Sequence, residues 1–180
     1  MNISRVCQLF LVFLAVWMGT PHTVTGSQPD EYQVKAVFVI NFSKLTEWPK
    51  ESVSEKTTFP IAIIGKVPSL TFENTLKGQS VHGAQVTVRH IEVAEDAKGC
   101  RLVYIAASER HRLSGLIQEL RQLNVLTVSD MEAFCESGGM IGLLSGHNKI
   151  SFEVNLAAVR KSHLNVSSKL LKLAKDIYGN

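Results

Sequence analysis

The chain has little of what marks an enzyme, a metalloprotein or a dinucleotide-binding protein. No Gly-x-Ser-x-Gly motif is present, so the common signature of a serine hydrolase is missing. No six-residue glycine fingerprint is present either. The histidines after the leader never recur at metal-ligand spacing, and no two cysteines stand close together in sequence. We therefore expect no catalytic residues, no metal and no cofactor.

Strong charge of one sign and long apolar runs are also missing. The chain holds 19 basic and 16 acidic residues, without a basic block, which argues against a nucleic-acid partner. Beyond the leader described next, no apolar run reaches the roughly 18 residues of a membrane span, so we predict a domain that is not membrane-embedded.

The first 26 residues have the layout of a secretory signal peptide. Arg5 precedes an uncharged run of 13 residues at positions 6–18, and a polar stretch with a turn former follows at 19–26. The run is shorter than the roughly 20 residues of a membrane anchor, although an uncleaved signal anchor is the alternative. We predict export and one mature domain over residues 27–180, with a net charge of +2 once Arg5 is removed.

Helical and strand patterns alternate along the mature chain. A helix is predicted over 30–48, ended by Pro49, with Val34, Val37, Phe38, Phe42, Leu45 and Trp48 on its apolar face. Strands are predicted at 59–65, 85–91, 101–106 and 125–128, helices at 69–77 and 108–123, capped by Ser69 and Ser108, then a hairpin over 140–155 and two closing helices. In the last helix Val166, Leu170, Leu173, Ala174 and Ile177 form the apolar stripe. The fold class is α/β: a single domain with a three-layer mixed β-sheet and helices on both faces.

Two cysteines remain in the mature chain. In an oxidising compartment, Cys100 and Cys135 would be expected to pair. If the two strands near them run parallel, however, Cys100 lies at the start of one and Cys135 beyond the end of the other. The gap is then roughly 20 Å, and a disulfide needs Cα atoms within about 7 Å. We therefore favour two unpaired thiols.

Three motifs in fixed order carry a family resemblance. They are 35–44 (KAVFVINFSK) with 47–49 (EWP); 125–130 (VLTVSD) with 137–141 (SGGMI); and 150–155 (ISFEVN) with 166–174 (VSSKLLKLA). Over roughly residues 31–177 the chain resembles the YfiR-like family of periplasmic proteins. The resemblance implies a periplasmic α/β domain that often forms a homodimer. It also implies a repressor whose partner is an inner-membrane sensor protein of the diguanylate cyclase type, YfiN, so that loss of repression raises cyclic di-GMP and favours biofilm.

The first predicted helix is the candidate partner surface, together with the exposed side of the 150–155 strand. A helix that is apolar on more than one side, with an aromatic residue at its end, suits a protein contact. The residues assigned to this contact are Val37, Ile40, Asn41, Lys44, Glu47 and Trp48. The alternative is structural: Trp48 packs under the sheet edge and Glu47 is solvated.

A second site is predicted where a strand ends. Open α/β sheets hold ligands at the carboxyl ends of their strands, and Ser129 and Asp130 occupy such a place. Gly138 and Gly139 could cradle an anion nearby. The structural alternatives are that Asp130 caps a helix beginning near Met131 and that the two glycines form a turn. A periplasmic sensor of a small metabolite is therefore the alternative function.

Overall fold

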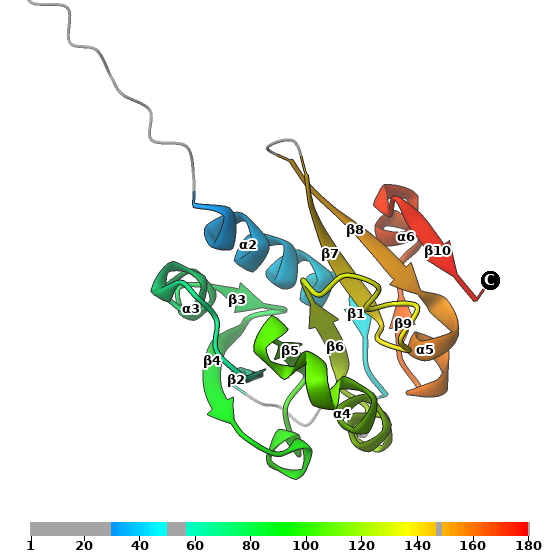
Figure 1. The fold of residues 1–180 in the computed structure, drawn as a ribbon. Helices are drawn as coiled ribbons and strands as arrows, with labels where there is room; N and C mark the ends of the chain where they lie inside the picture. The colour runs from blue at the N-terminus through cyan, green and yellow to red at the C-terminus, as the bar shows by residue number, and fades with distance from the viewer. Residues whose placement is uncertain (1–29, 50–56, 147–148, 180) are drawn as a thin grey trace, which may run out of the picture.

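A computed structural model describes residues 30–49, 57–146 and 149–179, and the predicted leader at 1–26 lies outside them. Eight strands form the central sheet in the order β10-β8-β7-β6-β5-β2-β4-β3 (Figure 1). Their bounds are β2 Thr58–Ile64, β3 Ser80–Val81, β4 Ala84–Ile91, β5 Leu102–Ile105, β6 Leu126–Ser129, β7 Ile141–Gly146, β8 Lys149–Asn155 and β10 Asp176–Tyr178. Two further strands, β1 (Thr46–Glu47) and β9 (Asn165–Val166), form a separate antiparallel pair.

The sheet is mixed. Strands β4, β2, β5, β6 and β7 run parallel, β3 is antiparallel to β4, and β8 is antiparallel to β7. Strand β10 pairs with β8 in parallel and forms one edge of the sheet. The five parallel strands therefore end at a common edge, which we call the carboxyl edge.

Helices cover both faces of the sheet, which confirms the predicted three-layer α/β fold. They are α2 (Glu31–Lys44), α3 (Leu70–Lys77), α4 (Leu113–Leu120), α5 (Leu156–Lys161) and α6 (Ser168–Leu173). Figure 1 shows α2 and α4 on opposite sides of the sheet. Successive side chains of β2 point to opposite faces of the sheet and pack in two separate cores. Ile61 and Ile63 pack with α2 and α3, and Ala62 and Ile64 pack with α4. In the described part of the chain, no helix is long and apolar enough to cross a membrane.

The first helix is shorter than predicted. It ends at Lys44, and Thr46 and Glu47 leave it to pair with β9. The Thr46 hydroxyl donates to the Phe42 carbonyl at 2.8 Å, which satisfies an acceptor in the last turn. The buried face also differs from the predicted one, because Val37 is exposed and the buried residues are Lys35, Ala36, Val39, Ile40, Phe42 and Ser43.

Two other helix predictions were too long. The helix predicted over 108–123 is α4 with a 3₁₀ turn at each end, and Ser108 does not cap it. The Ser108 hydroxyl instead accepts a hydrogen bond from the Lys66 amide at 2.9 Å. The last helix stops at Leu173, and residues 176–178 form the edge strand β10. Leu173 is therefore exposed rather than part of a buried stripe.

Both cysteines of the domain are buried and free. Strands β5 and β6 are parallel, which is the premise that placed the two thiols far apart. The Arg89 guanidinium donates to the Cys100 sulfur at 2.8 Å, and the Cys135 thiol donates to the Glu153 carbonyl at 3.5 Å. Burial, followed by the nearby Glu153 charge, raises the pKa of Cys135 well above its usual range. Cys135 is therefore an unreactive thiol at neutral pH.

Candidate functional site

The N-terminus of α2 lies at the carboxyl edge of the sheet, next to the N-terminus of α3. The Asp30 carboxylate caps α2 by accepting from the Tyr32 amide at 3.2 Å, and it accepts from the Ser69 hydroxyl at 2.7 Å. Ser69 in turn caps α3 by accepting from the Thr71 amide. These hydrogen bonds, with that from Ser69 the strongest, lower the pKa of Asp30. The two helix starts are thus tied to each other.

A buried ion pair joins α2 to the end of β6. The Lys35 ammonium lies 2.7 Å from the Asp130 carboxylate and 2.6 Å from the Glu31 carboxylate. Lys35 is 3% exposed. Burial alone would lower its pKa, but the hydrogen bonds to Asp130 and Glu31 outweigh burial, so the pKa of Lys35 is raised. Glu31 also accepts from the Ser145 hydroxyl at 2.7 Å, which extends the connection to β7.

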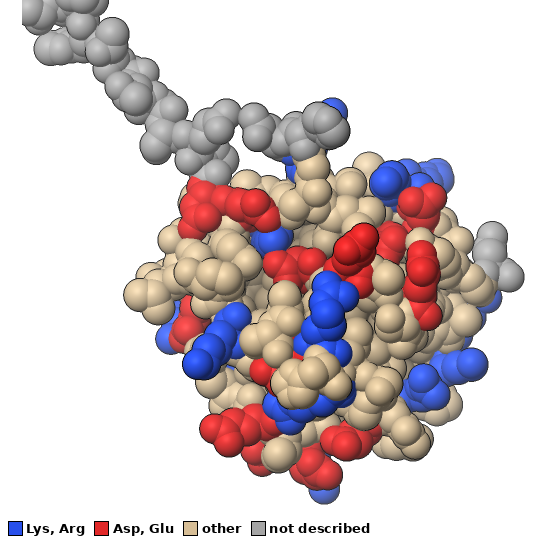
Figure 2. Space-filling view, in the orientation of Figure 1, with Lys and Arg blue, Asp and Glu red and all other residues tan. Residues whose placement is uncertain are grey.

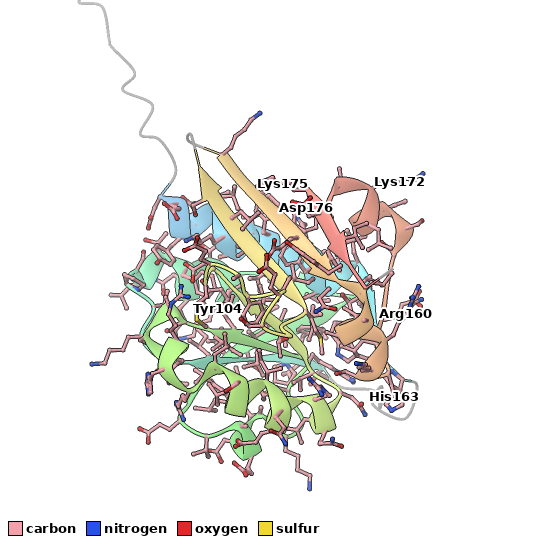
Figure 3. All side chains as sticks on the ribbon, turned by 45° about the vertical axis from the view of Figure 1, so that its right-hand side comes forward. Tyr104, Arg160, His163, Lys172, Lys175 and Asp176 are labelled. Atoms are coloured by element: carbon pink, nitrogen blue, oxygen red, sulfur yellow. The ribbon has the colours of Figure 1, made fainter. Side chains whose placement is uncertain are left out.

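Two tyrosines complete this cluster. The Lys35 ammonium sits 4.5 Å from the ring centroid of Tyr32, whose hydroxyl donates to Asp130 at 3.5 Å. Tyr104, on β5, lies inside the molecule (Figure 3), and its buried hydroxyl has no hydrogen-bond partner among the described residues. Burial, followed by the charge of Asp130, raises the pKa of Tyr104 above its usual range. We call the five residues Glu31, Tyr32, Lys35, Tyr104 and Asp130 the edge cluster.

The edge cluster offers charged and hydrogen-bonding groups at the carboxyl edge. Its ammonium is held by two carboxylates, and the Tyr104 hydroxyl, which makes no hydrogen bond in the described part of the chain, lies within the influence of the Asp130 charge near the strand ends where open α/β sheets hold ligands. The described residues contain no group of three or more His, Cys, Asp or Glu side chains that could hold a metal ion. Figure 2 shows acidic and basic side chains interspersed on one face of the molecule.

The predicted ligand residues do not form one pocket. Ser129 is buried, and its hydroxyl donates to the Ile105 carbonyl at 2.7 Å and accepts from the Met131 amide at 3.0 Å. Gly138 and Gly139 lie on the other face of the sheet, where a Cβ on Gly138 would contact Ile117 of α4. Gly138 is the last residue of the turns at 132–138, and Gly139 follows it.

Helix capping by Asp130 was also a wrong expectation. Residues 132–138 form successive turns rather than a helix, so Asp130 has no helix to cap. Its carboxylate bonds to Lys35 instead. Asp130 is therefore the one member of the predicted pocket that belongs to the edge cluster.

Three of the predicted partner residues share an open face of α2. Val37, Asn41 and Lys44 are exposed and follow one another at spacings of four and three residues, so they lie on one side of the helix. We call these three residues the α2 outer face. Glu47, on β1, is exposed and accepts from the Asn165 amide group at 3.2 Å.

The remaining partner assignments need correction. Ile40 is 2% exposed and packs in the core, so it is not open to a partner. Trp48 has the structural role: its ring packs edge-on against Phe59 with centroids 5.5 Å apart, and its indole donates to the Arg101 carbonyl at 3.1 Å. Strand β8 lies between β7 and β10, and its middle residues 152–154 are buried, so the predicted open side of that strand is largely covered.

Comparison with known proteins identifies the family of the chain. The sequence model of the YfiR/HmsC-like family matches residues 32–175, from the first turn of α2 to the residue before β10. The chain belongs to this family.

Two solved structures share the fold of this YfiR/HmsC-like protein. One is a conserved domain protein from Vibrio cholerae O1 biovar El Tor str. N16961, with a TM-score of 0.57, 8% identity, and coverage of 82% of this chain and 60% of that one. The other is the ABC domain in complex with L-Trp from Streptococcus pneumonia, with a TM-score of 0.53, 7% identity, and coverage of 77% and 58%. The chain thus spans about three-fifths of each, and the likeness is one of fold.

Sequence reasoning missed most of the edge cluster in this YfiR/HmsC-like chain. Lys35, Tyr32 and Tyr104 were not singled out, because a lysine on a helix and a tyrosine on a strand are ordinary. One signal was available: Lys35 stands four residues after Glu31 and immediately before five apolar residues at 36–40. A charge at the start of such a run is expected to need a partner once the helix is buried.

Proposed function

We propose that this protein is an exported, periplasmic regulatory protein that represses a membrane-bound diguanylate cyclase, or a related sensor, by protein contact. The observation that carries the proposal is the match of the YfiR/HmsC-like family over residues 32–175. A regulatory role also agrees with the edge cluster, whose ion pair supplies recognition groups but no activated nucleophile.

Repression by contact requires a difference in affinity. The domain must bind the inactive state of its receptor more tightly than the active state, because equal affinity for both shifts nothing. Each difference of about 1.4 kcal/mol changes the ratio of the two states tenfold. Lower cyclic di-GMP and less biofilm would follow from holding the receptor in its inactive state.

We assign the contact to the α2 outer face, together with Glu47. Val37 supplies an exposed apolar side chain, Asn41 and Lys44 supply donors, and Glu47 supplies an acceptor. The opposite side of α2 is fixed in the core and by the Lys35–Asp130 ion pair. A rigid helix loses little conformational freedom on binding, which favours affinity.

A pull-down from detergent-solubilised membranes, with residues 27–180 as bait, tests the assignment. We expect the bait to recover an inner-membrane protein with a cyclase output. Val37→Asp should abolish recovery, whereas Val93→Asp should leave it unchanged. The two valines are matched, since each is 46% exposed. Equal recovery by both variants would move the contact away from α2, and no recovery by a folded, monodisperse bait would remove the repressor proposal.

A second candidate function is a small-ligand sensor at the edge cluster. The Tyr104 hydroxyl supports it, because this buried donor has no hydrogen-bond partner among residues 30–49, 57–146 and 149–179, and a ligand acceptor could satisfy it. L-tryptophan is a reasonable first probe, since a solved structure of the same fold is described in complex with it. A ligand at 100 times its Kd stabilises a protein by about 2.7 kcal/mol. A thermal shift in the wild type that Tyr104→Phe abolishes would support the sensor. If no compound of a metabolite panel shifts the melting temperature, repression remains as the proposed function.

A further inference from the structure

Positive charge is concentrated at the C-terminal end of the domain. Between residues 156 and 179 there are five basic residues and one acidic residue, Asp176. Between residues 30 and 155 there are 13 basic and 15 acidic residues. The net charge of the domain is near neutral, but the positive charge is concentrated toward its C-terminal end. The basic residues, which we call the basic flank, are Arg160, Lys161, Lys169, Lys172 and Lys175.

The basic flank is exposed and unpaired. All five side chains belong to exposed residues, and none makes an ion pair with any residue that the structure describes. In Figure 3 the labelled Arg160 and Lys172 lie on one side of the molecule, beside α5 and α6. His163 is on this side as well. Lys175 stands in the short link between α6 and β10. Unpaired cations gathered in this way attract an anionic surface.

An exposed apolar side chain stands among these lysines. Leu173 is 71% exposed, one position after Lys172 and one helical turn after Lys169. The helix that presents it is held in place, because Leu170 is buried in the core and the Ser167 hydroxyl caps the first turn. Ile177, on the adjacent edge strand, is also exposed. The flank thus combines fixed positive charge with a protruding leucine.

We propose that the basic flank docks the protein on an anionic lipid bilayer. Lysines near a surface rich in anionic phospholipid are attracted to its headgroups, and a leucine on the same side can enter the interface between headgroups and acyl chains. The composition favours a bilayer over an acidic protein, because protein interfaces are enriched in aromatic residues and arginine and are poor in lysine. The basic flank has four lysines and one arginine, and the one aromatic residue between 156 and 179, Tyr178, is half-buried and donates its hydroxyl to Glu153. Docking would hold the domain at the membrane surface independently of any receptor.

Vesicle flotation with residues 27–180 tests this proposal. The vesicles contain either phosphatidylglycerol with phosphatidylethanolamine or phosphatidylcholine alone. We expect binding only to the anionic vesicles, and release at 1 M salt, where the screening length falls to about 3 Å. Lys169→Glu with Lys172→Glu should weaken binding by at least about tenfold. The matched control is Lys66→Glu with Lys98→Glu, two exposed lysines elsewhere that make no ion pair with the described residues.

A second pair of variants isolates the leucine. Leu173→Ser should weaken vesicle binding, and Leu70→Ser, at a position that is 81% exposed on α3, should not. Circular dichroism confirms that each variant is folded. Equal binding to phosphatidylcholine vesicles, or equal loss in the control variants, would overturn the proposal. Retention on a poly-glutamate resin without vesicle binding would also overturn it, and would assign the flank to an acidic polypeptide.

Discussion

At the scale of single residues, Lys35 connects the fold to the edge cluster. Its ammonium is removed from water, yet it stays charged because Asp130 and Glu31 both accept from it. A buried pair of this kind adds little net stability compared with apolar residues of the same size, but breaking it leaves one charge buried and alone. Its value here is positional: it fixes the start of α2 against the end of β6.

Replacing one partner of this pair should therefore be costly. We expect Lys35→Met to lower the free energy of unfolding by about 3–5 kcal/mol, because the Asp130 carboxylate then loses its cation. The double variant Lys35→Met/Asp130→Leu should recover most of that loss. Urea unfolding of the wild type, both single variants and the double variant measures the coupling. Additive losses would show that the two side chains do not act as a pair.

Tyr178 gives the folded domain an alkaline pH dependence. Its hydroxyl donates to the Glu153 carboxylate at 3.0 Å, and this hydrogen bond, aided by burial, raises the pKa of Tyr178 from 10.0 to about 12. The folded state thus holds a proton that the unfolded state releases first. The contribution to stability is complete below pH 10 and is lost as the pH rises from 10 to about 12.

Titration of tyrosinate absorbance tests this dependence. The difference between the wild type and Tyr178→Phe isolates the curve of Tyr178. We expect Glu153→Gln to move the Tyr178 midpoint down toward 10, since the carboxamide carries no negative charge. A midpoint that Glu153→Gln leaves in place would mean that Glu153 does not set this pKa.

At the scale of helices and strands, the sequence predicted the strands better than the helices. Apolar runs bounded by turn residues predicted β2, β5, β6 and β7, because a strand buried on both faces must be continuously apolar. Alternation of apolar and polar residues predicted β4 and β8. The ends of helices depend on tertiary contacts. Pairing of Thr46 and Glu47 with β9 ended α2 early, and pairing of residues 176–178 with β8 replaced a predicted helix by a strand. Neither pairing leaves a local signal.

Dependence on tertiary contacts also explains which site residues the sequence predicted and which it missed. Asp130 was placed correctly at a strand end, but its partner Lys35 comes from a helix 95 residues earlier, and no local pattern joins the two. Ile40 was assigned to the partner contact, but it is buried in the core. Helical periodicity shows that residues share a side of a helix, and it does not show which apolar residues the rest of the domain covers. All three residues of the α2 outer face, Val37, Asn41 and Lys44, were among the residues assigned to the partner contact.

Substitutions at two glycines distinguish the effect of steric overlap from the effect of helix propensity on stability. A Cβ on Gly139 would overlap the buried ring of Phe134, whereas a Cβ on Gly115, within α4, meets nothing within 4 Å. We expect Gly139→Ala to destabilise the domain by about 1–3 kcal/mol through overpacking. Gly115→Ala should stabilise it by about 0.5–1 kcal/mol through helix propensity. Urea unfolding measures both, and a tolerated Gly139→Ala would mean that the 132–138 turns can shift at little cost.

At the scale of the whole molecule, separate surfaces carry separate roles. The α2 outer face is assigned to the receptor, the edge cluster fixes α2 and offers a ligand position, and the basic flank is assigned to the bilayer. The sheet joins all three, since α2 packs on it, Asp130 directly follows β6, and β10 forms its edge beside the flank. Under the proposed function, these surfaces would share one purpose, which is regulation at a membrane.

The most direct test of repression is the cellular level of cyclic di-GMP after deletion of the gene in a strain that expresses the protein. We expect the level to rise on deletion, and to return to normal with the wild-type gene or the Val93→Asp variant but not with Val37→Asp. Immunoblotting confirms equal amounts of each variant. An unchanged level of cyclic di-GMP after deletion would contradict repression of a diguanylate cyclase.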